Sequence, residues 1–392
     1  MNIYSSASVT RHKQEGATLV LYMLGLVVIV GMAGLALDMG HAYINKSKLQ
    51  NALDAAALSG AKILNDTQDV SQADTTALAT FASNMNVAGL TPTVEYSSTL
   101  DPFVPGSVNP RYIRVKLSQQ QFAPWFAEVL PGVGNTLTVG GSAVAGPSAP
   151  LGTDPGSQVC DIAPMMVCGD PTATSCTSDG CYGYTYGQEI VLKAGSQTND
   201  AVGPGNYQLI QLDCGAGGAC VRDNLAGAYG GCLTNDTSVT TKPGDTVGPT
   251  AQGFNTRFGI YNGPVSQADY PPDVVTTHPY TYGPYQDRLK NGPYDYSPVP
   301  TGIGVPQRRV MAVPFGDCSG TTNGQGDVTV MGFGCFFLTK PAQMGGDQQV
   351  YGEFVGDCKA AGTASENPPS ESTVGSALYK IILYKDPDST DS

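Results

Sequence analysis

The chain has 392 residues, a formal net charge of −13 and only 14% charged side chains. At roughly 100–200 residues per domain, this length predicts two or three domains. The acidic balance argues against nucleic acid as a partner, because a nucleic-acid-binding protein presents a basic face. The three histidines lie far apart in the sequence, which argues against a histidine-based catalytic or metal centre.

An uncharged apolar stretch occupies residues 18–37, after a polar segment that carries Arg11 and Lys13. A helix of this length would measure ~30 Å, the hydrocarbon thickness of a bilayer. A cleavable secretory signal is the alternative, but its apolar core is usually about 7–15 residues long. We therefore expect a retained anchor in contact with membrane lipid. The positive-inside rule then places residues 1–16 in the cytoplasm and the rest of the chain on the other side.

The helical pattern continues beyond the apolar stretch. Residues that recur at intervals of three or four along one side are Leu49, Leu53, Ala56, Gly60 and Leu64. This period predicts one continuous helix over 17–64. Small residues on such a face let another backbone approach closely. The face is expected to pack either in the protein's own core, which we favour, or against another subunit.

Residues 65–147 carry the pattern of a small α+β domain. Ser71 followed by Asp74 is typical of a helix cap, and the apolar spacing behind it predicts a helix that ends near Gly89. Alternation of apolar and polar residues predicts a strand over 111–118.

The same domain is expected to end with a short helix over 121–130, which contains the single tryptophan Trp125, and a strand over 136–145. The following residues 148–159 are rich in proline and glycine, which favours a linker.

All ten cysteines lie after residue 159. They are Cys160, Cys168, Cys176, Cys181, Cys214, Cys220, Cys232, Cys318, Cys335 and Cys358. Their number is even and none is spaced as Cys-x-x-Cys, which favours up to five disulfides in an oxidising compartment over zinc ligation. Buried free thiols are the alternative, and the pairing stays open.

Residues 160–385 are expected to form a mostly β domain, because glycine and proline separate short apolar runs there. The candidate strands are 186–193, 207–213, 309–314, 327–331, 333–338 and 377–384. The polar residues 386–392 are expected to be a disordered tail.

A stretch rich in tyrosine and proline runs from 261 to 300 and is expected to be irregular. Its candidate recognition residues are Tyr280, Tyr282, Tyr285, Tyr294 and Tyr296. Exposed tyrosines on a stiff loop offer binding area at a low cost in entropy. The loop could therefore bind a surface or a host ligand, or its tyrosines could cover the domain's own core.

Several N-terminal features occur together: residues 11–17, the apolar span, Leu37-Asp-Met-Gly40, Tyr43 and residues 49–61. In these features the segment resembles TadG-like proteins, which belong to the Tad (tight adherence) systems that assemble Flp pili of the type IV class. The resemblance implies a bacterial inner-membrane protein with one span and a cytoplasmic N-terminus. The bulk would be periplasmic or displayed on a pilus, and its partners would be pilins or other Tad proteins.

The same resemblance points to Gly16 and Ala17 as a prepilin-type processing site. Related prepilins have a glutamate at the fifth position after the glycine, and Leu21 stands there in this chain. This departure argues against processing and against a role as the bulk fibre subunit. The Asp-x-Ser-x-Ser metal sequence of some TadG-like proteins does not occur here.

No sequence pattern supports an enzyme. Ser59 and Lys62 have Ser-x-x-Lys spacing, but they lie inside the expected packing helix, and no Gly-x-Ser-x-Gly occurs. We therefore expect no catalytic residues, no metal site and no cofactor.

The elements together predict an α+β protein: a long transmembrane helix, a small pilin-like α+β domain and a disulfide-rich, mostly β domain. Its expected function is that of a non-enzymatic, membrane-anchored structural component of Tad/Flp pilus assembly. The alternative is a minor pilin-like tip adhesin that binds through the tyrosine-rich loop.

Overall fold

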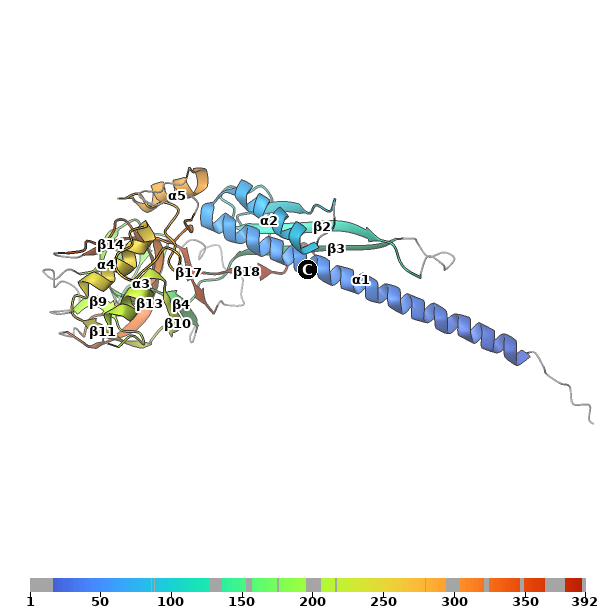
Figure 1. Ribbon diagram of the computed structural model, residues 1–392, viewed down its shortest axis with the longest axis horizontal. Helices are drawn as coiled ribbons and strands as arrows, with labels where there is room; N and C mark the ends of the chain where they lie inside the picture. The colour runs from blue at the N-terminus through green and yellow to red at the C-terminus, as the bar shows by residue number, and fades with distance from the viewer. Residues whose placement is uncertain are drawn as a thin grey trace, which may run out of the picture.

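The computed structural model describes residues 17–85, 87, 89–126, 136–152, 157–174, 176–194, 206–215, 217–278, 280–293, 303–320, 324–345, 349–363 and 378–389. The molecule is elongated, with a long helix projecting from a β-rich body (Figure 1). Helices and strands are both present, and strands dominate after the N-terminal region. The predicted α+β class is confirmed.

One continuous helix, α1 (Ala17–Thr67), forms the N-terminal part of the described chain. Its 51 residues make it ~77 Å long at 1.5 Å per residue. Helix α2 (Val70–Met85) follows and folds back along it (Figure 1). The side chain that caps α2 is Asp69, whose Oδ1 accepts from the backbone N–H groups of Ser71 and Gln72. The cap expected at Ser71 is therefore displaced by two residues.

The second half of α1 packs on a four-stranded antiparallel sheet. Its strands lie in the order β1 (Thr93–Ser97), β2 (Tyr112–Phe122), β3 (Leu137–Pro147) and β18 (Ile381–Tyr384). We call this sheet with α2 and residues 38–67 of α1 the helix–sheet unit. Its core contains side chains from the helices and from both central strands.

The short helix expected over 121–130 does not form where the structure describes the chain. Strand β2 continues to Phe122, which pairs with Leu137 of β3, and a bend follows at Trp125 and Phe126. Residues 127–130 lie outside the described residues. Pairing with β3 satisfies the backbone here and overrides the local preference for a helix.

The C-terminal strand returns to the helix–sheet unit. Strand β18 pairs with β3, with Ile381 opposite Pro147 and Tyr384 opposite Val144. Residues 381–384 thus lie in the N-terminal sheet, whereas the sequence placed them in the cysteine-rich domain. The described residues between 157 and 363 form the body that we call the head.

The described residues 148–152 of the expected linker run beside the returning chain. The backbone N–H of Ser148 donates to Lys380 O, and that of Leu151 donates to Leu378 O. Both side chains are buried. Outgoing and returning segments are therefore hydrogen-bonded to each other between the two parts of the protein, and strand β4 begins at Gln158.

The head is built around a ten-stranded sheet. Its strands are β4 (Gln158–Ile162), β5 (Val167–Gly169), β8 (Glu189–Lys193), β9 (Asn206–Ile210), β10 (Tyr229–Thr234), β11 (Ser238–Pro243), β12 (Val310–Asp317), β13 (Asp327–Leu338), β14 (Val350–Val355) and β16 (Ala361–Gly362). Short pairs are formed by β6 (Gly180–Cys181) with β7 (Tyr184–Thr185) and by β15 (Cys358–Lys359) with β17 (Leu378–Tyr379). The helices of this region are α3 (Gly218–Ala226), α4 (Val247–Asn255), η2 (Thr256–Phe258) and α5 (Tyr282–Asn291).

Strand β13 is the central element of the head. The two strands expected at 327–331 and 333–338 form this single strand, which pairs with β12, β11 and β14. Its consecutive residues Phe336 and Phe337 are fully buried in two different hydrophobic clusters. Side chains alternate between the faces of a strand, so the sheet carries an apolar core on each side.

Five disulfides connect the ten cysteines, so the expected cross-linking is present and no cysteine is free. The pairs are Cys160–Cys232, Cys168–Cys318, Cys176–Cys181, Cys214–Cys220 and Cys335–Cys358. The first joins strands β4 and β10, and the last joins β13 to β15. The last bridge thus ties the central strand of the head to β15, which pairs with β17 of the returning chain.

Candidate functional site

The first half of α1 projects away from the helix–sheet unit (Figure 1). Its large apolar side chains are exposed; for example, Leu21 is 68% and Ile29 is 64% exposed. Among the described helices, α1 is long and apolar enough to cross a membrane. Each large apolar side chain left in water forgoes ~1.5–3 kcal/mol of burial free energy. This half of α1 therefore requires an apolar environment that the described chain does not provide.

The packing face of α1 begins where this exposed part ends. All five residues expected on it are buried: Leu49, Leu53, Ala56, Gly60 and Leu64. A Cβ placed on Gly60 would lie 2.6 Å from Ile113 Cδ1 of β2 and 3.0 Å from Ala77 Cβ of α2. The absence of a side chain at Gly60 thus lets α1, α2 and β2 approach one another. This face serves the protein's own core, which was the favoured alternative.

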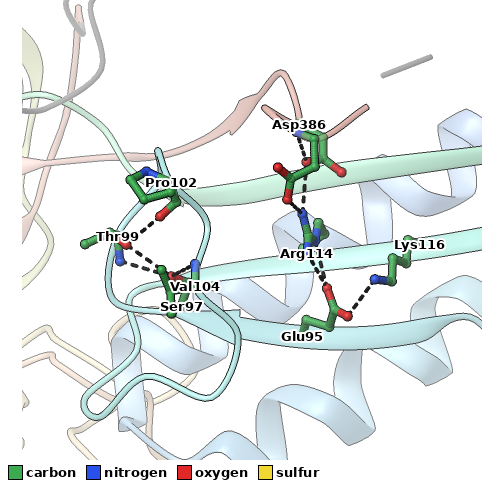
Figure 2. Close-up of polar contacts among 9 residues, drawn as sticks. Glu95, Ser97, Thr99, Pro102, Val104, Arg114, Lys116 and Asp386 are labelled. Atoms are coloured by element: carbon green, nitrogen blue, oxygen red, sulfur yellow. Dashed lines mark hydrogen bonds and ion pairs between the residues drawn. The ribbon is translucent and has the colours of Figure 1, made fainter. Parts of the chain in front are cut away.

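A cluster of charged side chains around the buried Arg114 fastens the returning chain to this sheet (Figure 2). The guanidinium of Arg114 on β2 donates through Nε to Glu95 of β1 at 2.8 Å and through Nη1 to Asp386 at 3.2 Å. It also contacts Asp388, and Lys116 Nζ lies 2.6 Å from Glu95 Oε1. Asp386 is only 3% exposed. The disorder expected for 386–392 is therefore wrong for Asp386, Asp388 and their described neighbours.

The charges of this cluster reinforce one another. Burial alone would lower the pKa of Arg114, but hydrogen bonds to Asp388 and Glu95 outweigh it and raise that pKa. Burial would raise the pKa of Glu95, yet hydrogen bonds from Lys116 and Arg114 hold it below its ordinary value. Charge-assisted hydrogen bonds of this kind are about twice as strong as neutral ones. Both shifts favour the charged forms of Arg114 and Glu95, and the contact of Arg114 with Asp386 holds the segment after β18 against the sheet.

A second set of polar contacts joins the end of α1 to the head. Gln307 Nε2 donates to the backbone oxygen of Asp66 at 3.2 Å, and the Asp66 carboxylate pairs with Lys359 of β15. Directly before β2, Arg111 Nη2 donates to Asp357 Oδ2 at 2.7 Å. The last turn of α1 is thus tied directly to the body that it carries.

A polar cavity of about 520 Å³ lies at this junction, between the end of α1, helix α5 and strands β15 and β17. Arg111, Tyr282 and Tyr379 are among its lining residues. The Arg111 guanidinium lies over the Tyr379 ring, 5.2 Å from its centre. Within the described ranges, no three histidine, cysteine or acidic side chains are grouped so that they could hold a metal ion.

The tyrosine-rich stretch, which was expected to be irregular, contains helix α5, and this helix directs Tyr285 into the core of the head. Tyr285 of α5 is fully buried, its hydroxyl donates to Asp273 Oδ2 at 2.8 Å, and its ring packs 4.7 Å from that of Phe337. Tyr285 cannot therefore contact an external ligand. Tyr280 and Tyr282 are half-buried against the same core. Tyr294 and Tyr296 lie outside the described residues.

The expected processing site falls at the edge of the structure. Gly16 lies outside the described residues, and Ala17 is the first residue of α1.

One contact that the sequence did not indicate joins α1 to the far end of the β2 strand. The carboxylate of Asp38, which is 3% exposed, accepts hydrogen bonds from the backbone N–H groups of Trp125 and Phe126. The Trp125 ring stacks on His41 with ring centres 4.2 Å apart. In the sequence, the charge of Asp38 directly after the uncharged span was the only indication of this contact. The partner Trp125 lies 87 residues further along the chain.

The model of a protein family described as "Putative Flp pilus-assembly TadE/G-like" matches residues 16–62. The match covers almost all of α1, with its exposed apolar half and its packing face. The N-terminal segment is therefore similar to TadE/G-like pilus-assembly proteins, which agrees with the resemblance noted in its sequence. Comparisons with curated proteins and with solved structures return no match.

Proposed function

We propose that this protein is a non-enzymatic, membrane-anchored structural component of a bacterial Tad/Flp pilus assembly system. The observation that carries the proposal is the division of α1 into two halves. The first half exposes its apolar side chains over a length sufficient for a membrane, and the second half is buried in the protein's own sheet. The TadE/G-like match coincides with that same helix.

In this proposal α1 crosses the inner membrane once, with Arg11 and Lys13 on the cytoplasmic side. The head then lies in the periplasm or is carried on the pilus. Its five disulfides fit an oxidising compartment. Pilins or other Tad proteins are the proposed partners.

The structure suggests how such a component would carry load. The head is connected to the helix–sheet unit by two adjacent chain segments, and the contacts of Asp66 and Arg111 brace the junction. A force on the head would thus reach α1 through covalent and ionic connections together. This arrangement supports a structural role in which the anchor and the head act as one unit.

The experiment that tests the proposal separates the head from its anchor. Residues 1–37 are replaced by a cleavable secretory signal in the source bacterium, and an unrelated twenty-residue transmembrane helix serves as the matched control. Assembled pili are counted by electron microscopy. We expect the released protein, residues 38–392, to fail to restore pili in a deletion strain, whereas the protein with the unrelated transmembrane helix restores them at least in part.

Full assembly with the released protein would contradict the proposal. Normal pili with lost adherence in the deletion strain would instead support the tip adhesin, the alternative function.

A further inference from the structure

The bend after β2 contacts α1 where α1 leaves its apolar span. We propose that this bend is a second membrane-contacting element, in which Trp125 and Phe126 lie in the interfacial layer of the bilayer that α1 crosses. The inference rests on the proposed anchor and adds a contact surface outside the helix. The partner is a lipid surface, defined by its polar headgroups and the adjoining acyl chains.

A carboxylate on α1 fixes the position of the bend. Asp38 Oδ1 accepts from Trp125 N at 2.7 Å, and both carboxylate oxygens accept from Phe126 N at 3.1–3.2 Å. An exposed carboxylate at the edge of a membrane span would be strongly hydrated and would limit how far the helix enters. Here the backbone donors hydrogen-bond to it, and the side chain is buried. Asp38 thus links the helix and the bend into one surface.

The two aromatic side chains lie at different levels along the helix. Phe126 packs on Gly34, where an added Cβ would lie 2.9 Å from Phe126 Cβ. Trp125 stacks on His41 at an interplanar angle of 16°. Gly34 lies inside the apolar span and His41 lies beyond it, so the pair covers ~10 Å along the helix axis. That length is comparable to the interfacial layer of one leaflet, which is roughly 5–8 Å thick.

The surface is open and continuous with the apolar span. Trp125 is 62% and Phe126 is 46% exposed, and the neighbouring Leu37 and Met39 of α1 are also exposed. Tryptophan is enriched at membrane interfaces because its ring has an apolar body and a polar N–H. This patch merges with the side chains of the span itself. A bilayer that covers the span therefore reaches the patch as well.

A second contact would fix the orientation of the protein. The tilt and rotation of a single membrane helix are set by interfacial aromatic anchors and by packing against neighbours. Because Trp125 and Phe126 lie on one side of α1, the same face of the helix–sheet unit would always be directed toward the membrane. The head would then project in a defined direction, which suits a component that positions partners.

Trp125 is the only tryptophan of the chain, so its intrinsic fluorescence reports on this site alone. The full-length protein is reconstituted in phosphatidylcholine vesicles that carry nitroxide groups near the headgroup or deep in the acyl chain. Aqueous iodide serves as the opposing quencher. We expect the shallow nitroxide to quench Trp125 more strongly than the deep nitroxide does. We also expect iodide to quench Trp125 less in the vesicles than in the protein unfolded in denaturant without detergent.

Two pairs of variants test the geometry. Gly34→Leu displaces Phe126, whereas its control Gly31→Leu adds the same side chain where nothing lies within 4 Å. Asp38→Ala removes the acceptor for both backbone donors, whereas Asp38→Asn retains an acceptor oxygen. We expect Gly34→Leu and Asp38→Ala to lose the shallow quenching and the two controls to keep it.

Flotation of the vesicles separates this inference from the anchor. Protein that floats with the vesicles while Trp125 stays fully accessible to iodide, without quenching by the shallow nitroxide, overturns the inference and leaves the anchor intact. Equal loss of shallow quenching in Gly34→Leu and Gly31→Leu also overturns it. Protein that does not float contradicts the proposed anchor itself, and the second contact with it.

Discussion

The guanidinium of Arg114 donates a hydrogen bond to the carboxylate of Asp386, 3.2 Å away in space and 272 residues later in the chain. Both groups are nearly inaccessible to water, with Arg114 7% and Asp386 3% exposed. This pair fastens the C-terminal segment to the sheet on which α1 packs. Both chain segments that lead into and out of the head are therefore held by the helix–sheet unit.

Removal of this arginine is expected to weaken the attachment of the C-terminal segment to the sheet strongly. Arg114→Met removes the buried cation between Asp386 and Glu95, and breaking a buried pair in this way costs ~3–5 kcal/mol. The expected result is a lower urea midpoint and protease cleavage near residues 378–389. Lys116→Ala is the control, because Lys116 is 39% exposed and an exposed pair contributes about 0–1 kcal/mol. Equal effects of the two variants would contradict the role of Arg114.

The attachment of the C-terminal segment to the sheet is also expected to depend on pH. Glu95 has a folded pKa below its ordinary value of 4.5, because the hydrogen bonds from Lys116 and Arg114 outweigh burial. Its contribution to stability is then fully present above pH 4.5 and is lost as pH falls through the lower folded value. Urea unfolding between pH 3 and pH 7 measures this loss. Glu95→Gln should have a shallower acid decline than the unchanged protein, and an identical decline would contradict the assignment.

Two glycines of α1 should respond to alanine in opposite directions. Alanine at Gly60 would press on Ile113 and Ala77, and such overpacking typically costs ~1–3 kcal/mol. Gly40 has nothing within 4 Å of an added Cβ. Gly40→Ala should therefore be neutral, or stabilising by up to ~1 kcal/mol through helix propensity. Thermal unfolding compares them, and equal midpoints would show that α1 does not need Gly60 for close packing.

The disulfides should differ in their contributions to stability. Cys168–Cys318 closes a segment of 150 residues and Cys176–Cys181 one of 5 residues. Loop-closure entropy gives ~5 kcal/mol for the long loop and ~2 kcal/mol for the short one. Paired Cys→Ala replacement of each bridge, followed by urea unfolding of the head, measures the difference. A larger loss for the short bridge would contradict the entropic ranking.

Helix α1 could be predicted because its signal is local. An uncharged stretch followed by Leu49, Leu53 and their periodic neighbours specifies both the span and the buried face within one element. Tyr285 and Leu289 carry the same kind of signal for α5, since residues four apart share a helix face. The prolines and glycines around them obscured that pattern.

The features that the sequence did not indicate depend on contacts between distant residues. Strand β18 is short, and its place beside β3 is set by pairing across more than 230 residues. Asp386 looks like part of a polar tail until Arg114 is placed beside it. The bend at Trp125 depends on Asp38 in the same way. Cysteine pairing likewise needs the fold, because ten cysteines allow many combinations.

The proposed function requires that α1 anchors the protein in the membrane while the head lies on the non-cytoplasmic side. The most direct measurement adds protease to intact spheroplasts and to inside-out inner-membrane vesicles, with carbonate extraction to confirm integration. We predict that the protein remains in the carbonate pellet and that the head is digested in spheroplasts but protected in inside-out vesicles. Release by carbonate, or protection in spheroplasts with digestion in inside-out vesicles, would contradict this account.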